Sequence, residues 1–330
     1  MKILGLGNAL VDILAKLSSD DTLIELSLPK GGMQLIDESK RNHILSVISQ
    51  MPQKMTAGGS ASNTLAALAK MNLDAGFVGK IGNDKYGAFY REDVTHIGMS
   101  AHLIQKEASS GTAMALISTD GERTFGTYLG ISSELSAEDL TDEIFQKYNY
   151  LYVEGYMVQN YDLIETAMQM AKKQGMKIIV DTASYNVVAE NRDFFWKLIS
   201  EYVDIVFANE EEARALTGLE PEQAIQLIGD KAEITVIKIG AKGALAMCNG
   251  DCILVPAFPV QLVDATAAGD FFAAGFLYGL HKEQSIQQCT QLGTLFASEI
   301  IAVVGTRLDD NSWKKIKLGA EKILSSPSLN

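Results

Sequence analysis

The sequence predicts an α/β fold in which a mostly parallel central sheet is covered by helices on both faces. Short apolar runs, such as Tyr150-Leu151-Tyr152-Val153, alternate with longer segments of helical period, such as 163–173, and this alternation is typical of parallel strands joined by helices. With 330 residues, 47% of them hydrophobic, the chain is long enough to bury a large core. The expected strands lie at 77–81, 150–153, 177–181, 204–207 and 234–238, and the expected helices at 61–70, 163–173, 194–201 and 210–216.

Two regions depart from this alternation and predict a small antiparallel sheet. Residues 11–40 and 99–130 alternate apolar and polar positions, and 119–122 read as a hairpin turn. Ligands bind at the carboxyl ends of parallel strands, so a sheet projecting there would act as a lid. Its strands could also meet those of a second subunit, which allows a homodimer through the lid. The expected domains are a core at 1–10, 41–98 and 131–330 and a β lid at 11–40 and 99–130.

Composition argues against several classes of protein. The formal net charge of −13, without a block of Lys or Arg, disfavours a nucleic-acid partner. Cys248, Cys252 and Cys289 have neither the number nor the spacing of a disulfide framework or a four-ligand zinc site. The first residues lack a signal-peptide pattern, and no stretch is apolar enough to span a bilayer. We therefore expect a cytoplasmic protein that binds a small molecule and neither nucleic acid nor membrane.

The most informative segment reads D-A-T-A-A-G-D and then opens an apolar helix, over residues 264–276. Small side chains at Ala267, Ala268 and Gly269 let backbone N–H groups approach an anion at the helix start. Asp270 would lie beside that anion, where a carboxylate can accept a proton from a substrate hydroxyl. This arrangement favours phosphoryl transfer, although small residues at a strand-to-helix turn also arise from close packing.

A second cluster of small residues precedes the helix expected at 61–70. Gly58 and Gly59 would bring the backbone close to a ligand, and the amide of Asn63 could bind hydroxyl groups such as those of a sugar. The alternative is a glycine turn with Ser60 or Ser62 as the helix cap.

The N-terminal strand carries two polar residues, Asn8 and Asp12, in an apolar context. A carboxylate can accept hydrogen bonds from two adjacent hydroxyls, which suits a ribose or a hexose. Gly5 and Gly7 suggest a dinucleotide-binding turn, but the third glycine of that fingerprint is missing, which disfavours a nicotinamide dehydrogenase.

Two further segments suit a nucleotide and its metal. Asn209 and Glu212 follow an apolar strand, and carboxylates there could hold Mg²⁺ through water. Lys238 ends a strand before the turn that contains Gly240 and Gly243. The alternatives are favourable charge at a helix N-terminus and an ordinary hairpin. The chain has no Walker A sequence, so an ATP site must use another architecture.

With these motifs, the chain resembles the ribokinase-like (PfkB-type) carbohydrate and nucleoside kinases over nearly its full length. Several spaced motifs in family order are far more specific than any one of them. The matching elements are Gly7-Asn8 with Asp12, Gly58-Gly59 with Asn63, 79–84 with Gly87, Asn209 with Glu212, Gly240 with Gly243, and 264–270. The resemblance implies a three-layer α/β/α core with a small β lid. The family usually has glycine where Ala267 stands, but alanine still offers its N–H.

The resemblance also implies a role for each motif and the use of ATP and Mg²⁺. Asp270 would be the catalytic base for a primary alcohol, with Ala267, Ala268 and Gly269 as the anion hole. The acceptor would be held by Asn8, Asp12, Gly58, Gly59 and Asn63, and ATP with Mg²⁺ by Asn209, Glu212 (through water), Lys238, Gly240 and Gly243. Asp264 and Thr266, with carbonyls around 302–305, fit the position where family members often bind a monovalent cation such as K⁺.

The stretches 120–130 and 154–156 look most like the adenosine-kinase-like branch, and Phe125 or Tyr128 could stack on a base. We therefore expect an ATP-dependent phosphotransferase that acts on the primary hydroxyl of a purine nucleoside, with adenosine favoured. A kinase for ribose, fructose or a related free sugar is the alternative. A catalytically silent ligand-binding protein of the same fold is a further one.

Overall fold

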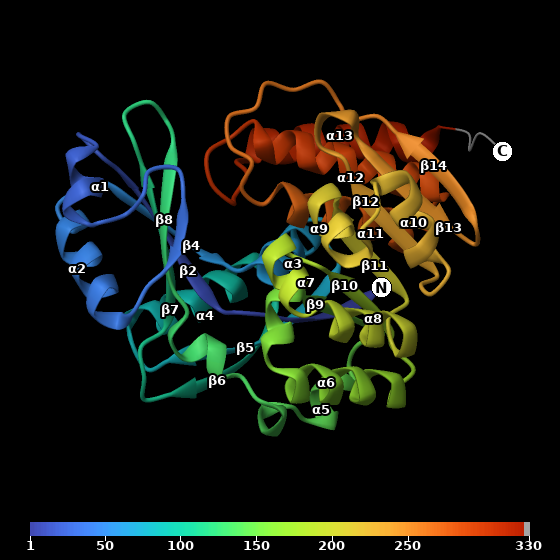
Figure 1. Ribbon diagram of the computed structural model, residues 1–330, viewed down its shortest axis with the longest axis horizontal. Helices are drawn as coiled ribbons and strands as arrows, with labels where there is room; N and C mark the ends of the chain where they lie inside the picture. Colours follow the sequence, from blue (N-terminus) through green and yellow to red (C-terminus); the bar gives the residue numbers. More distant parts are fainter. Residues whose placement is uncertain (327–330) are drawn as a thin grey trace.

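The computed structural model describes residues 1–326, and two sheets organise the chain (Figure 1). The larger sheet contains, in spatial order, β14 (Asp251–Val255), β13 (Ala244–Cys248), β12 (Ile234–Lys238), β11 (Ile205–Asn209), β10 (Lys177–Asp181), β9 (Tyr150–Glu154), β1 (Lys2–Leu6), β5 (Asp74–Gly82) and β6 (Ser100–Lys106). Neighbouring strands are parallel except at β12–β13 and β13–β14, which are antiparallel. The expected parallel sheet is confirmed.

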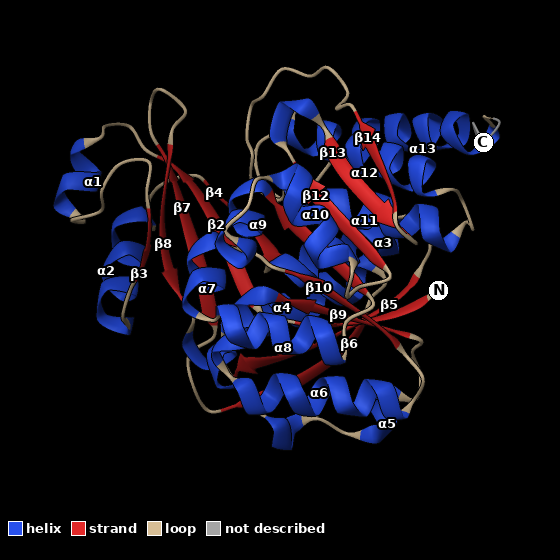
Figure 2. Cartoon of the chain, turned by 45° about the vertical axis from the view of Figure 1, so that its right-hand side comes forward, coloured by secondary structure: helices blue, strands red, loops and turns tan. Residues whose placement is uncertain are grey.

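Helices cover both faces of this sheet (Figure 2). One hydrophobic cluster joins the sheet to α3 (Ser60–Lys70), α4 (Lys85–Ile97), α11 (Ala268–His281), α12 (Ile286–Ile301) and α13 (Asp310–Ser325). Two others join it to α5 (Asp142–Phe145), α6 (Tyr161–Lys173), α7 (Tyr185–Glu190), α8 (Arg192–Glu201), α9 (Glu210–Thr217) and α10 (Pro221–Gly229). Within residues 1–326, none of the helices is both long and apolar enough to cross a membrane.

The local sequence explains these elements, as α6 and β10 illustrate. The buried residues of α6 recur at helical spacing and form one stripe: Leu163, Ile164, Ala167, Met168 and Ala171. The side chain of Asn160 caps the start of the helix by accepting from the N–H of Leu163 at 3.1 Å. By contrast, β10 is buried continuously from Ile178 to Asp181, because helices cover both sides of a parallel strand.

The smaller sheet forms the lid, which stands beside the core at the left of Figure 1. Its strands are, in spatial order, β3 (Met33–Leu35), β8 (Arg123–Tyr128), β7 (Gly111–Ile117), β2 (Leu10–Lys16) and β4 (Gln53–Gly58). Two helices, α1 (Asp21–Glu25) and α2 (Glu38–Ile48), belong to the lid. Ile44 of α2 contacts the outer face of the lid sheet at Gly126.

Three segments differ from their expected domains, and the first is residues 41–48, which were expected in the core but belong to α2 of the lid. Residues 100–106, expected in the lid, form β6 at the edge of the main sheet, and residues 53–58, expected in the core, form β4 of the lid. An edge strand is only partly covered, so β6 shows the same polar and apolar mixture as a lid strand. The pairing of β4 depends on β2, some forty residues earlier along the chain, and no local pattern reports it.

The lid sheet is mixed rather than antiparallel. β2 pairs with β4, and β7 with β8, in antiparallel fashion, and the turn expected at 119–122 does connect β7 to β8. However, β2–β7 and β3–β8 are parallel. Segments that are distant in sequence can pair in either direction, whereas only neighbours joined by a tight turn must be antiparallel.

The turn between β4 and α3 depends on Gly59. Its backbone has φ 94° and ψ 139°, a combination that is essentially restricted to glycine. A Cβ atom at this position would collide with the carbonyl oxygen of Asn8. This turn therefore sets how α3 begins beside the end of β1.

We expect Gly59→Ala to lower the free energy of unfolding by about 3 kcal/mol, since both backbone strain and a collision oppose it. Gly175→Ala is the matched control, because Gly175 also has a positive φ of 69° but no atom lies within 4 Å of the added carbon. The control should lose only about 1 kcal/mol. Thermal or urea unfolding measures both, and equal losses would show that the contact with Asn8 is unimportant.

Candidate active site

Asp270 lies in the first turn of α11, which lies beside α3 (Figure 2). Two residues of α3 hold the carboxylate of Asp270. The hydroxyl of Ser60 donates to Oδ1 at 2.7 Å, and Nδ2 of Asn63 donates to Oδ2 at 3.0 Å. The hydroxyl of Thr64 donates to the backbone oxygen of Asp270 at 3.2 Å. Both carboxylate oxygens therefore have a fixed orientation.

Arg307 fixes the orientation of Asn63 in turn. Its Nη1 donates to Oδ1 of Asn63 at 3.0 Å. Arginine can only donate, so the amide oxygen of Asn63 must face Arg307 and the amide nitrogen must face Asp270. Arg307 also donates to the carbonyl of Ala57 and lies 3.7 Å from the carboxylate of Asp93.

Burial raises the pKa of Asp270 to about 6, and the negative charge of Asp181 acts in the same direction. The hydrogen bonds from Ser60 and Asn63 and the charge of Lys238 oppose this rise. The side chain nevertheless remains partly accessible to solvent. A carboxylate with a pKa near 6 is mostly ionised at pH 7 and is more basic than an ordinary aspartate, as a general base requires.

Asp12 lies on the lid strand β2 and faces Gly58 on β4. A side chain at Gly58 would collide with the carboxylate of Asp12, so glycine is needed here to make room for it. The hydroxyl of Thr306 donates to Oδ2 of Asp12 at 3.3 Å. Burial raises the pKa of Asp12 to about 7, although the charge of Arg307 opposes the shift.

Asn8 is held by Glu154, the last residue of β9. One carboxylate oxygen of Glu154 accepts from the backbone N–H of Asn8 at 2.8 Å and from its Nδ2 at 3.0 Å. The other accepts from the N–H of Ala61 in the first turn of α3 at 2.9 Å. Burial raises the pKa of Glu154 to about 7. Glu154 thus ties the end of β1 to the start of α3.

A lysine lies between two acids at the carboxyl edge of the main sheet. Nζ of Lys238 lies 3.1 Å from Oδ2 of Asp181, and a Cβ atom placed on Gly269 would lie 3.1 Å from the same Nζ. Burial lowers the pKa of Lys238, but the carboxylates of Asp181 and Glu212 outweigh it, so the pKa is raised overall. The ammonium group therefore faces the N-terminal turn of α11 in its charged form.

Asn209 and Glu212 come together as a capping box at the start of α9. The side chain of Asn209 accepts from the N–H of Glu212 at 2.8 Å, and Glu212 accepts from the N–H of Asn209 at 2.7 Å. The hydroxyl of Thr182 donates to Glu212 at 2.7 Å. Burial raises the pKa of Glu212. The alternative interpretation of this motif, in which Glu212 stabilises a helix N-terminus, therefore agrees with the structure. The carboxylate of Glu212 nevertheless lies beside Lys238.

The three residues predicted to form an anion hole, Ala267, Ala268 and Gly269, lie at the turn that leads into α11. Ala267 has a left-handed conformation with φ 62°, and α11 begins at Ala268. The N–H of Ala268 donates to the carbonyl of Ala265 at 3.2 Å. The next N–H groups, those of Gly269 and Asp270, lie in the first helical turn, where such groups have no partner inside the helix. Together with Lys238, they form a positive surface suited to a phosphate, and Asp181 and Glu212 are suited to the water shell of Mg²⁺.

Gly240 and Gly243 form a tight turn after Lys238, with φ values of 58° and 108°. A Cβ atom at Gly243 would collide with the backbone of Val255 on β14, whereas nothing lies within 4 Å of one at Gly240. The space above Gly240 is therefore open at the carboxyl end of β12.

Asp264 and Thr266 lie next to each other, and the lid reaches both of them. Oδ1 of Asp264 accepts from the N–H of Thr266 at 3.0 Å, and Oδ2 accepts from the N–H of Gly305 at 2.7 Å. The guanidinium of Arg123, the first residue of β8, forms an ion pair with Asp264 and donates to the hydroxyl of Thr266 at 3.2 Å.

Comparisons with known proteins agree with this architecture. A family profile described as pfkB family carbohydrate kinase matches residues 33–313. The chain is 26% identical over 327 residues to adenosine kinase 2 of Arabidopsis thaliana, covering 91% of this chain and 93% of the relative. It is 29% identical over 264 residues to the ribokinase of Haemophilus influenzae, covering 76% of this chain and 82% of the relative. The solved structure of adenosine kinase from Sinorhizobium meliloti matches with a TM-score of 0.85 and 31% identity, covering 97% of this chain and 99% of that chain.

The fold and these relatives define a phosphotransferase that acts on a hydroxyl group, a kinase for a sugar or a nucleoside. A carboxylate held beside a helix N-terminus is consistent with that chemistry. The chain belongs to the pfkB family of carbohydrate kinases. The resemblance drawn from the spaced motifs is confirmed, and so is the ribokinase-like fold with its lid.

The structure adds residues at the site to which the sequence analysis assigned no functional role. Asp181 could have been predicted from the sequence, because it ends an apolar strand, just as Asn209 and Lys238 end the next two strands. The other additions are Ser60 as a partner of Asp270, and Glu154, Thr182, Arg123, Thr306 and Arg307. Their contacts join segments far apart in sequence, so no local pattern reports them.

We expect the stability advantage of Asp270→Asn over the wild type to grow as the pH rises from about 4 to about 6. The folded wild type, with a pKa of about 6 at Asp270, binds a proton more tightly than the unfolded chain, with a pKa of 3.8. Its stability therefore falls with rising pH across this window, by at most about 3 kcal/mol, and then stays level. Thermal unfolding of both proteins between pH 4 and 8 measures the difference, and a constant difference would contradict the raised pKa.

Proposed function

We propose that the protein transfers the γ-phosphate of ATP to the primary hydroxyl of a purine nucleoside, with adenosine favoured. The observation that carries this proposal is a row of residues across the inner face of the lid. Asp12 pairs with Ala113, Ala113 with Thr127, and Thr127 with Leu35. Directly paired residues point to the same face of a sheet, so all four share the face of Asp12.

The length of this row suits a nucleoside better than a free sugar. Strands lie about 4.8 Å apart, so Leu35 is about 14 Å from Asp12. A sugar bound at Asp12 spans only part of that distance, whereas a base attached to it would extend over Ala113 toward Thr127. Leu35 has 58% of its surface exposed, which is unusual for a large apolar side chain on the inner face of a lid.

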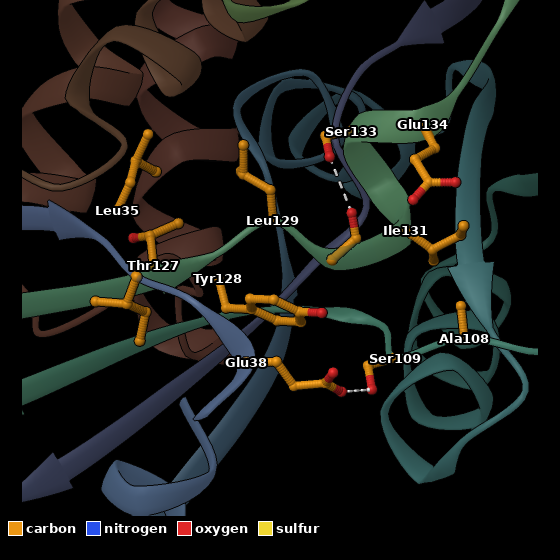
Figure 3. A pocket seen from close by; sticks show the side chains of 12 residues that line it. Leu35, Glu38, Ala108, Ser109, Thr127, Tyr128, Leu129, Ile131, Ser133 and Glu134 are labelled. Carbon is orange, nitrogen blue, oxygen red and sulfur yellow. Dashed lines mark hydrogen bonds between the residues drawn. The ribbon is translucent and has the colours of Figure 1, made fainter. Parts of the chain in front are cut away.

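A pocket of about 540 Å³ lies at the far end of the row (Figure 3). Leu35, Thr127 and Leu129 line it from the lid, and Ile131 and Glu134 line it from the segment that follows β8. Its lining is a mixture of apolar and polar groups, as expected of a site that holds an aromatic base with ring nitrogens.

In this proposal, Asp270 accepts the proton of the attacking hydroxyl, and Ser60 and Asn63 keep its carboxylate aligned. Asn8 and Asp12 hold the sugar hydroxyls, with Gly58 and Gly59 giving the acceptor close access to the backbone. The first turn of α11 and Lys238 hold the transferring phosphoryl group in line with the hydroxyl. Mg²⁺, when bound, neutralises charge on the phosphates, and Glu212 and Asp181 would hold its waters.

The remaining parts of the nucleotide site follow the same reasoning. Asn209 would position Glu212, and the turn at Gly240 and Gly243, with its open space above Gly240, would receive the nucleoside part of ATP. A monovalent cation at Asp264 and Thr266 is one hypothesis. The guanidinium of Arg123 contacts the same atoms, which supports the competing hypothesis that Arg123 takes the place of the cation. We further expect a cytoplasmic location and a homodimer through the lid edges.

A kinase for a free sugar such as ribose or fructose is the second candidate, because the relatives include a ribokinase as well as adenosine kinases. A catalytically silent binding protein is disfavoured because Asp270 retains both of its orienting partners.

Initial rates of ADP formation with adenosine, inosine, ribose and fructose as acceptors test the proposal directly. We expect the highest kcat/KM with adenosine, and a preference for a free hexose would overturn the choice of acceptor. Asp270→Asn should lower kcat by about 100-fold or more without loss of acceptor binding, since it removes the base. In the wild type, kcat should fall below about pH 6 as Asp270 is protonated. Turnover by the variant near that of the wild type would refute the catalytic role.

Leu35→Ala tests the row on the lid. Removing a contact with a base should raise KM for the nucleoside about 5- to 30-fold and leave the weak activity with ribose unchanged. Ile24→Ala is the matched control, because Ile24 is a 77% exposed apolar residue on α1 of the same lid. Equal effects of Leu35→Ala on both acceptors would argue for a free-sugar site.

A further inference from the structure

A residue of the lid, Arg123, supplies a positive charge to the loop that precedes α11. The Asp264 side chain has only 4% of its surface exposed, and the Arg123 side chain has 11%. A buried carboxylate is costly unless a counter-charge and hydrogen bonds accompany it. Asp264 has both, since the N–H groups of Thr266 and Gly305 and the guanidinium of Arg123 all contact it.

We infer that the guanidinium of Arg123 occupies the position of a monovalent cation beside the anion hole, so that this kinase works without K⁺. The inference rests on the proposed kinase function but not on the choice of acceptor. The side-chain atoms available to a cation here, beside the backbone carbonyls around 302–305, are the Asp264 carboxylate and the Thr266 hydroxyl, and Arg123 already engages both of them.

A metal ion does not fit this donor set while Arg123 is present. Two backbone N–H groups and an N–H of the guanidinium occupy most of the lone pairs of the Asp264 carboxylate. An incoming ion would have to displace Arg123 and leave a largely buried guanidinium without its partner, which is strongly unfavourable. Arginine stays protonated at every accessible pH, so the charge is permanent.

Arg123 takes the place of a cation but belongs to the protein chain. Its position in the fold therefore has a consequence that a dissolved ion would not have. Arg123 is the first residue of the lid strand β8, whereas Asp264, Thr266 and Ala267 belong to the loop that leads into α11. The positive charge therefore reaches the loop only when the lid lies over the site. Acceptor binding and the electrostatics of the phosphate site are coupled through one side chain.

Rates measured at constant ionic strength in KCl, NaCl or N-methylglucamine chloride test the inference. The wild-type rate should agree within about 2-fold in the three salts. Arg123→Met keeps the length of the side chain without its charge, so we expect a loss of about 10- to 100-fold. The loss should be partly reversed by KCl or by guanidinium chloride, but not by N-methylglucamine. Arg214→Met is the control, because it removes an arginine whose ion pair is exposed and is made with Glu220 rather than with Asp264.

Thermal unfolding without substrates gives a second readout. The wild type should unfold at the same temperature in KCl and NaCl, whereas Arg123→Met should be stabilised specifically by KCl, because the vacated site then has room for the ion. If Arg123→Met does not fold, Arg123→Lys retains a charge and should remain independent of K⁺.

Activation or stabilisation of the wild type by K⁺ over Na⁺ by several-fold or several degrees would overturn the inference. An unchanged rate in Arg123→Met, or a loss that no cation reverses, would also overturn it. If no acceptor is phosphorylated in any salt, the proposed function has failed, and the comparison of unfolding temperatures still decides the role of Arg123.

Discussion

The candidate site depends on the alignment of one carboxylate by a neighbouring helix. Asp270 belongs to α11, but its orientation is set by Ser60 and Asn63 of α3, and Asn63 is itself oriented by Arg307. A base that rotated freely would lose much of its catalytic effect, because proton transfer needs a fixed distance and direction. The contact between α3 and α11 on one face of the sheet therefore orients the Asp270 carboxylate as well as packing the two helices.

The distribution of charge around this carboxylate follows from burial. Acidic groups at Asp12, Glu154 and Asp270 lie close together, and burial raises the pKa of each. The protein balances them with few cations, of which Lys238 and Arg307 are the nearest. Such a site is suited to an uncharged molecule that can donate hydrogen bonds, and the Lys238 side, at the start of α11, is suited to an anion.

The sequence was sufficient for the architecture and for the motifs but not for their connections. Periodicity located the parallel strands and most helices, and the small residues before Asp270 located the start of α11, because these features depend on local geometry. The assignment of β4 and β6 to their sheets failed because strand pairing depends on distant partners. The contacts of Arg123 and Arg307 were also out of reach, since nothing local to either residue indicates that Asp264 or Asn63 lies beside it.

Two of the passages of the chain between core and lid contain residues that the proposed function places around the acceptor. β1 ends at Leu6 and β2 begins at Leu10, so the first passage contains Asn8, and the return from β4 to α3 runs through Gly59. Hinges absorb backbone rotation at a few residues of this kind. Asn8 and Gly59 thus belong both to the connections between core and lid and to the proposed sugar contacts, so a substitution at either residue would alter the attachment of the lid together with the binding of the acceptor.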